Sequence, residues 1–209
     1  MGNFKKIKLL VVAAYGPELK ALISLGRKHA VIRDGVAYLQ AGIGPVAATF
    51  GLTHFLEDYR PQKIMAIGTA GTFNTKRFPV GTIVQAKSVS MVSHLPGFYA
   101  CVDSPLAPWG EDQGEGKDPT LVRVYAPQEI TCDAKCALQL AKHHDVEHLE
   151  SYAYALVAQK FKIPLQIILG LTNIVGPKGH VQWQKNEAAV MLQVAEAILR
   201  ELGFKKGRL

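Results

Sequence analysis

The sequence predicts an α/β protein in which helices cover a mostly buried β-sheet. Short apolar, β-rich runs alternate along the chain with longer segments of helical periodicity. The 209 residues suffice for one well-buried domain, and neither an internal repeat nor a clear domain boundary divides them. Alternation of this kind is typical of a sheet flanked by helices.

Six elements are predicted in the first ninety residues. In chain order they are a strand at residues 7–14, a helix at 17–25, a β-hairpin around Asp34-Gly35, a helix at 46–58, and strands at 63–68 and 81–89. Pro17 suits the first turn of a helix. Asp-Gly between two β-rich runs is a strong hairpin signal. The strand at 63–68 is expected to end in a small-residue turn, "GTAG".

The second half begins with a segment rich in Gly, Pro and Asp, from His94 to Pro119. A loop of that length inside a domain is typical of a lid, a binding loop or disorder. Four elements are predicted after it: strands at 121–126 and 164–173, a buried helix at 152–161 and an amphipathic helix at 186–202.

The composition argues against several classes of partner. The net charge is +7, but Lys and Arg are scattered, with clusters only near the two ends of the chain. A basic stripe interleaved with aromatic residues is missing from the sequence, so we expect no nucleic-acid partner. No apolar run reaches the length of a membrane span, and the apolar N-terminal stretch is better explained as a first buried strand than as a signal peptide.

Cysteine usage indicates a cytoplasmic protein with reduced thiols. Cys101, Cys132 and Cys136 are odd in number, and none of them forms a Cys-x-x-Cys pair. A metal bound by Cys132 and Cys136 would need two further ligands at suitable spacing, and the sequence offers none. We therefore expect no metal site.

In α/β sheets, chemistry collects in the loops beyond the carboxyl ends of the strands. Here those ends read "AAYGPE", "AGIGPVAA", "IGTAGTF" and "LGLTNIVG", and together they are expected to line one cleft. The second matches G-x-G-x-x-A, a dinucleotide-binding pattern. The next strand lacks the acidic residue that would hold a ribose, so glycines that let a helix and a strand pack closely explain the motif at least as well.

Four polar residues on four different elements are the candidates for chemistry. Each has an ordinary structural explanation on its own: Glu18 suits the first turn of a helix, and Thr69 and Asn173 suit turns. The fourth, Glu150, lies at the mouth of the buried helix at 152–161. Their joint placement at element ends favours a shared site.

The order of these motifs resembles the purine nucleoside phosphorylase and nucleosidase superfamily. The resemblance runs through most of the chain and is carried by "LLVVAAYGPELKAL", "AGIGPVAATFGLTHFLEDYRPQKIMAIGTAGTF", "PVGTIVQA" and "VEHLESYAYALVAQKFKIPLQIILGLTNIVG". It implies a single three-layer domain over residues 1–209, with a central mixed β-sheet flanked by helices. The motifs around Glu150 and Asn173 look most like futalosine hydrolase, an enzyme of an alternative menaquinone pathway.

The resemblance also implies roles for individual residues. Glu150 would accept hydrogen bonds from the ribose hydroxyls, with Leu149 packed on the sugar or base. Glu18 would position and deprotonate the attacking water, and Thr69 replaces the usual Ser near that water. The same resemblance places Gly44, Ala70, Gly71 and Ile130 against the substrate. Ile130, or its neighbour Thr131, would match the segment that stacks on the base.

Asn173 is an informative departure, because adenine-releasing relatives carry Asp there. Asn supplies no proton but offers both a hydrogen-bond donor and an acceptor, which suits a 6-oxopurine such as hypoxanthine. Loss of activity is the alternative explanation. A phosphorylase would hold phosphate with arginines, but Ala66 stands at one such position, and Glu18 would repel the anion. Water is therefore the expected nucleophile.

The leading hypothesis is a purine nucleoside N-ribosyl hydrolase of the futalosine hydrolase kind, without metal or organic cofactor. Cleavage of methylthioadenosine or adenosylhomocysteine is the second hypothesis, and a non-catalytic nucleoside-binding protein is the third. Relatives are generally homodimers, so a homodimer is expected here. Fold similarity alone does not fix a substrate.

Overall fold

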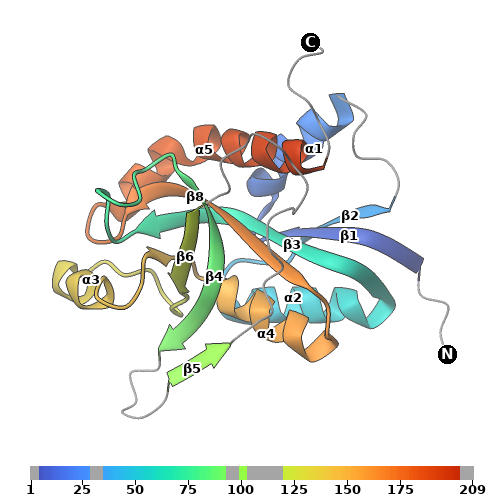
Figure 1. Ribbon diagram of the computed structural model, residues 1–209, viewed down its shortest axis with the longest axis horizontal. Coiled ribbons are helices and arrows are strands. Elements are labelled where there is room, and N and C mark those ends of the chain that lie inside the picture. Colours follow the sequence, from blue (N-terminus) through green and yellow to red (C-terminus); the bar gives the residue numbers. More distant parts are fainter. Residues whose placement is uncertain (1–4, 29–34, 93–98, 103–119, 203–209) are drawn as a thin grey trace.

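The computed structural model describes residues 5–28, 35–92, 99–102 and 120–202. They form one mixed sheet of eight strands with helices on both faces, the predicted α/β class (Figure 1). The strands are β1 (Lys5–Ala13), β2 (Val36–Gln40), β3 (Tyr59–Thr72), β4 (Ile83–Val92), β5 (Tyr99–Val102), β6 (Thr120–Tyr125), β7 (Val146–Glu147) and β8 (Leu165–Ile174). The helices are α1 (Gly16–Lys28), α2 (Pro45–Asp58), α3 (Ala134–Leu140), α4 (Ser151–Phe161) and α5 (Gly179–Glu201).

Strand β3 is central to the sheet. It pairs in parallel with β1 and with β8, and its last residues also pair with the short antiparallel strand β7. Strand β8 also pairs with β4, β4 pairs with β6, and β6 pairs with β7. Together with the pairings of β3 to β8 and to β7, these contacts form a closed ring of five strands. Side chains at the ends of β3, β7 and β8 are therefore brought together.

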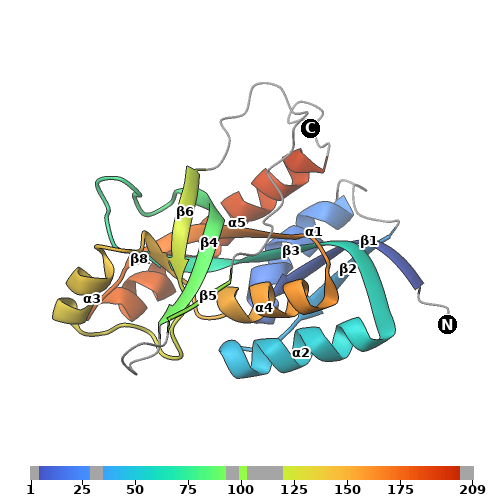
Figure 2. The ribbon, with the colours of Figure 1, turned by 60° about the horizontal axis from the view of Figure 1, so that its bottom comes forward.

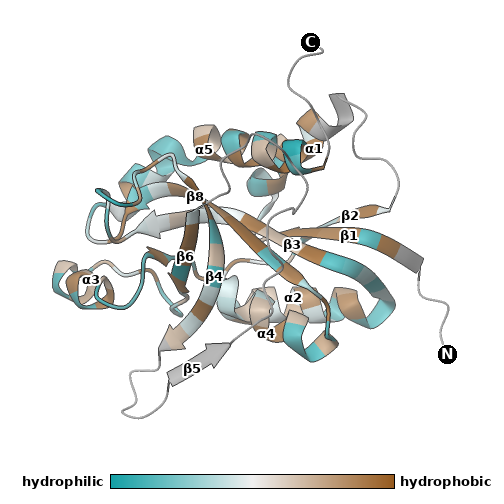
Figure 3. Cartoon of the chain, viewed as in Figure 1, coloured by the Kyte–Doolittle hydropathy of each residue, from teal (hydrophilic) through white to brown (hydrophobic). Residues whose placement is uncertain are grey.

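The sheet is covered by two pairs of helices. Helices α1 and α5 pack together over one face, and α2 and α4 pack together over the other (Figures 1 and 2). The side chains of β1 alternate between the two layers: Leu10 and Val12 belong to the cluster under α2 and α4, and Val11 and Ala13 to the cluster under α1 and α5. Because both layers are buried, β1 is apolar from residue 9 to its end at Ala13, after the lysines of its first half. Figure 3 shows this part of the strand in brown and a teal band before it.

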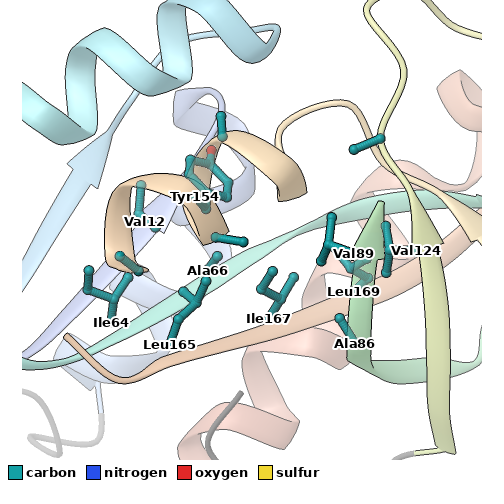
Figure 4. Close-up of a cluster of buried hydrophobic side chains, with 14 of the residues drawn as sticks. Val12, Ile64, Ala66, Ala86, Val89, Val124, Tyr154, Leu165, Ile167 and Leu169 are labelled. Atoms are coloured by element: carbon teal, nitrogen blue, oxygen red, sulfur yellow. The ribbon is translucent and has the colours of Figure 1, made fainter. Parts of the chain in front are cut away.

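The larger hydrophobic cluster anchors α4, the helix that begins next to Glu150. Tyr154 is completely buried and lies with Val12 and Ala66 of the sheet (Figure 4). Leu165 and Ile167 of β8 continue the same cluster. Fully burying an aliphatic side chain contributes about 1.5–3 kcal/mol, so this packing holds the start of α4 firmly in place.

Every predicted strand and helix that falls on described residues is present, although some bounds move. Helix α5 begins seven residues earlier than predicted, at Gly179. For the predicted hairpin, residues 29–34 lie outside the described part, and the second run is β2, which pairs in parallel with β1.

Two expectations need correction, and two elements were not predicted. The "GTAG" stretch is the last part of β3 and not a turn, because β8 and β7 continue to pair with it. The expected loop at 94–119 contains strand β5, which pairs with the end of β4; the rest of that loop lies outside the described residues. Finally, α3 and β7 were not predicted, since seven-residue and two-residue elements carry too little periodicity.

Among the described residues, no helix is long and apolar enough to cross a membrane. The same residues contain no group of three or more His, Cys, Asp or Glu side chains arranged to hold a metal ion. Cys132 and Cys136 are free thiols.

Candidate active site

A cavity of about 290 Å³ opens where the ends of β1, β3, β7 and β8 meet the starts of α1, α4 and α5. It is lined by Ala14, Tyr15, Glu18, Ile43, Thr69, Gly71, Ile130, Thr131, Glu147, His148, Leu149, Glu150, Asn173, Val175, Gly176, Gly179, His180 and Trp183. The strand ends that were expected to form one cleft thus do so, with a volume near the lower end of the range for small-molecule sites.

Glu18 is held at the bottom of this cavity by backbone groups. Its side chain is buried, with 3% of the residue exposed. One carboxylate oxygen accepts hydrogen bonds from the Ala14 amide at 3.1 Å, and the other accepts from the Thr69 amide at 3.1 Å and the Thr69 hydroxyl at 3.5 Å. Burial, reinforced by the negative charge of Glu150, raises the pKa of Glu18 to about 8. Glu18 thus takes up and releases a proton near neutral pH.

Glu150 approaches the same cavity from the N-terminus of α4. Its Oε1 accepts a 2.8 Å hydrogen bond from the backbone N–H of Gly44, in the loop before α2. Its Oε2 lies 3.4 Å from Nε2 of His148. Gly44 has a φ of 84°, which other residues rarely adopt, and this conformation directs its N–H to the carboxylate. The G-x-G loop therefore supports Glu150, which explains the motif without a dinucleotide.

His148 lies beside Glu150, and its ring and the Glu18 carboxylate both stand close to Gly68. Its Nδ1 lies 2.8 Å from the Ser151 hydroxyl, and burial lowers the pKa of His148, which keeps the ring neutral at pH 7. With Ser151 donating to Nδ1, the Nε2–H points to Glu150. A Cβ at Gly68 would lie 2.7 Å from this Nε2 and 3.2 Å from Oε1 of Glu18, so only a glycine at position 68 leaves room for both side chains.

Thr69 is fixed from the opposite side by α5. The indole N–H of Trp183 donates to its hydroxyl oxygen at 2.9 Å. The Trp183 ring packs against His180 and Tyr15, with ring centroids 5.5 Å and 6.3 Å away. These three side chains therefore form an aromatic wall of the cavity next to Thr69. The hydroxyl of Tyr15 is hydrogen-bonded to Glu187 of α5.

Asn173 lies at the end of β8, in register with Gly71 of β3. Its Oδ1 accepts from the Thr172 hydroxyl at 2.9 Å, and its Nδ2 donates to the carbonyl of Ile174 at 3.3 Å. A Cβ at Gly71 would lie 2.9 Å from that Nδ2, so the glycine makes room for the amide. One amide hydrogen of Asn173 remains for a ligand.

The remaining wall of the cavity comes from the segment before α3 and from β7. Ile130 is half exposed at the rim. Thr131 donates two hydrogen bonds to the buried carboxylate of Glu147, one from its amide at 3.0 Å and one from its hydroxyl. The segment that the resemblance matches to the base is thus anchored to β7 by Glu147.

Most of the residues proposed from the sequence line this one cavity: Glu18, Thr69, Gly71, Ile130, Leu149, Glu150 and Asn173. Two do not. Gly44 acts one step away, through its hydrogen bond to Glu150. Ala70 lies in the hydrophobic core, because alternate residues of a strand face opposite sides and its neighbours Thr69 and Gly71 face the cavity.

Sequence reasoning assigned no role to several lining residues, notably Tyr15, Glu147, His148, His180 and Trp183. His148 and Glu147 stand beside Glu150 in the chain, and a cluster of three polar residues before a buried helix was the available signal. Tyr15 belongs to "AAYGPE", one of the strand ends expected to line the cleft. Nothing local marks Trp183 as a cavity residue, since its packing depends on how α5 lies over the sheet.

Comparison with known proteins places the chain in a family. A family model described as the phosphorylase superfamily matches residues 11–202. The chain belongs to the phosphorylase superfamily. The 5′-methylthioadenosine/S-adenosylhomocysteine nucleosidase of Chromohalobacter salexigens is 24% identical to it, over 94% of this chain and 98% of the relative. Futalosine hydrolase of Streptomyces coelicolor is 26% identical, over 76% of each protein.

Solved structures show the same fold. A methylthioadenosine/adenosylhomocysteine nucleosidase of Helicobacter pylori has a TM-score of 0.78 at 13% identity, over 94% of this chain and 98% of that one. A futalosine hydrolase mutant of the same bacterium has a TM-score of 0.76 at 12% identity, with the same coverage. The predicted superfamily and fold are confirmed. The relatives named here are nucleosidases and futalosine hydrolases, which agrees with the predicted enzyme class.

Proposed function

We propose that the protein hydrolyses the N-glycosidic bond of a purine nucleoside with water, and that its substrate is of the futalosine type, releasing hypoxanthine. One observation carries the proposal: two buried carboxylates, Glu18 and Glu150, 132 positions apart in the chain, line one cavity together with Asn173. Paired carboxylates around a sugar suit an oxocarbenium-like transition state.

Glu18 is the proposed general base. A base works best when its pKa lies near the working pH, and the pKa of about 8 meets that condition. The amides of Ala14 and Thr69 hold its two oxygens in fixed positions. The Thr69 hydroxyl, positioned by Trp183, stands beside the carboxylate as a second hydrogen-bonding group for the water.

Glu150 is the proposed ribose-binding group. Its oxygens are oriented by Gly44 and His148 and retain lone pairs for the 2′- and 3′-hydroxyls. Hydrogen bonds to an ionised acceptor contribute about 1.5–3 kcal/mol each. The same negative charge favours the positive charge that develops on the sugar as the bond to the base breaks.

Asn173 is proposed to receive the leaving base through the free hydrogen of its amide. An amide stabilises N7 as a hydrogen-bond donor without protonating it. That role suits hypoxanthine, a better leaving group than adenine. The amide is held in place by Thr172 and Ile174. This ordered arrangement favours a change of substrate, rather than a loss of activity, as the reason for Asn at this position.

Water, rather than phosphate, is the proposed nucleophile. The described residues that line the cavity include Glu18, Glu147 and Glu150 but no Lys or Arg. A phosphate dianion placed there would meet like charges without a guanidinium to hold it.

Cleavage of methylthioadenosine or adenosylhomocysteine is the second candidate. It is favoured by the nucleosidase of Chromohalobacter salexigens, which aligns over 94% of this chain. The two candidates differ in the base released, and Asn173 favours the first.

The decisive assay incubates the protein with futalosine, inosine or methylthioadenosine, with and without phosphate, and detects the free base by chromatography. Hypoxanthine released from futalosine in phosphate-free buffer is the expected result. Strict dependence on phosphate would make the protein a phosphorylase, and faster release of adenine from methylthioadenosine would favour the second candidate. Thermal stabilisation by nucleosides without any product would indicate a binding protein.

We also propose that the protein is a homodimer whose interface borders the cavity. Ile43, Val46 and Phe50 form an apolar stripe at the start of α2, and they are 67%, 83% and 73% exposed. Ile43 also lines the cavity, so the stripe is continuous with the site. Light scattering should give twice the chain mass, and Val46→Asp with Phe50→Asp should give the monomer; a monomeric wild type would refute this.

A further inference from the structure

Glu147 is a buried carboxylate of the cavity for which the proposed reaction has no role. It is 7% exposed, and within the described part of the chain no ion pair involves it. Its hydrogen bonds come from Thr131, one to each oxygen. Each carboxylate oxygen has two lone pairs, so acceptor capacity remains on both.

The sheet places Glu147 opposite Asn173. Gly71 of β3 pairs with Glu147 of β7 on one side and with Asn173 of β8 on the other. Residues paired in this way point to the same face of a sheet, and all three line the cavity. Two strand spacings separate Glu147 from Asn173, which puts their Cα atoms about 10 Å apart. A purine bound over Gly71 fits between the two side chains.

Position along β3 separates the two ends of the site. Thr69, beside Glu18, marks the end for water and sugar. Gly71 lies two residues further along the same face, about 7 Å away. A nucleoside whose sugar faces Glu18 and Glu150 therefore extends its base towards Gly71, between Asn173 and Glu147.

The chemistry of Glu147 selects among bases. An ionised carboxylate only accepts hydrogen bonds. A 6-oxopurine carries a hydrogen on N1 and donates it, whereas N1 of a 6-aminopurine is an acceptor with a lone pair. Against a carboxylate, the first base gains a charge-assisted hydrogen bond and the second meets repulsion.

We infer that Glu147 is the specificity-determining residue for the base, and that it favours 6-oxopurines by accepting the N1–H while Asn173 donates to N7. The inference rests on the proposed function and adds the residue that selects its 6-oxopurine base.

A purely structural role for Glu147 is the competing explanation. Holding Thr131 requires no charge, because Gln would accept from the Thr131 amide and donate to its hydroxyl oxygen. Burial raises the pKa of Glu147, so the carboxylate is held there at a cost in stability that a neutral amide would avoid. Such groups in cavities are candidates for function.

The test compares nucleosides that differ only at position 6: inosine with adenosine, and methylthioinosine with methylthioadenosine. For the wild type we expect higher kcat/KM with the 6-oxo member of each pair. Glu147→Gln should lower the 6-oxo to 6-amino ratio at least tenfold, because the amide can donate to an unprotonated N1. Thr131→Val, which removes the hydroxyl but leaves the charge, should change the ratio by less than about threefold. Thermal unfolding confirms that each variant is folded.

Calorimetric binding of free hypoxanthine and free adenine is measured on the same three proteins, and this readout needs no turnover. Tighter binding of hypoxanthine by the wild type, weakened in Glu147→Gln and retained in Thr131→Val, supports the inference even if no nucleoside is cleaved. That outcome would refute the proposed hydrolysis but support the assignment of Glu147 to the base-binding site. An unchanged preference in Glu147→Gln, an equal change in both variants, or binding of neither base overturns the inference.

Discussion

Replacing Glu18 with Gln should stabilise the protein in alkaline solution and destabilise it slightly in acid. The Glu18 carboxyl ionises near pH 4.5 in an unfolded chain, whereas burial beside Glu150 raises its pKa to about 8 in the folded protein. Between these two values the folded state binds more protons than the unfolded state. The free energy of unfolding of the wild type therefore falls as the pH rises from about 4.5 to about 8.

The size of this effect follows from the two pKa values. At about 1.4 kcal/mol per pH unit, the difference between 4.5 and about 8 corresponds to about 5 kcal/mol lost above pH 8. Gln does not ionise and avoids this loss. Its amide nitrogen, however, replaces the oxygen that accepts from the Ala14 amide, which costs about 1–3 kcal/mol at every pH. The variant should thus be less stable at pH 5, equal near pH 6 and about 2–4 kcal/mol more stable at pH 9.

Urea unfolding at pH 5, 6, 7, 8 and 9 measures this crossover directly. Glu57→Gln is the matched control, since its side chain is 63% exposed on α2 and its curve should stay parallel to that of the wild type. A constant difference between wild type and Glu18→Gln across the series would refute the reasoning. Turnover provides the second readout: the wild type should gain activity towards pH 8, and Glu18→Gln should lose about two orders of magnitude or more.

Three further substitutions test other contacts. Glu150→Gln should lower kcat/KM for a nucleoside about tenfold to a hundredfold through loss of a charged acceptor, without changing affinity for the free base; equal losses in both would place Glu150 at the base instead. Trp183→Phe keeps the ring but removes the 2.9 Å hydrogen bond to Thr69, and should lower kcat several-fold with little change in melting temperature; unchanged kcat would mean that Thr69 needs no positioning. Gly170→Ala should destabilise the protein by about 1–3 kcal/mol in urea unfolding, because its Cβ would lie 2.3 Å from a methyl carbon of Val190; wild-type stability would show that α5 moves away easily.

The elements that the sequence predicted correctly are those with a long, uninterrupted pattern. The first eight residues of β8 are all buried, and most of them are apolar, because helices cover both faces of the strand. The candidate acids were found for a related reason: Glu18 and Glu150 stand at helix starts next to apolar runs, where a charge needs an explanation. The family resemblance then supplied their roles.

Other features depended on partners far away in the chain. "GTAG" has the composition of a turn, yet it extends β3 because β7 and β8, more than 70 residues later, pair with it. Ala70 and Gly71 are both small, and the alternation of the strand decides which of them faces the cavity.

By itself, the sequence determined the α/β class, the family and the residue types available for catalysis, because local periodicity and motif order are properties of the chain. The tertiary structure alone decided that Glu18, Glu150 and Asn173 meet, that Gly44 serves a carboxylate, and that Glu147 lies across Gly71 from Asn173. Pairing register and burial create these relations, and both are set by contacts between residues that no local pattern connects.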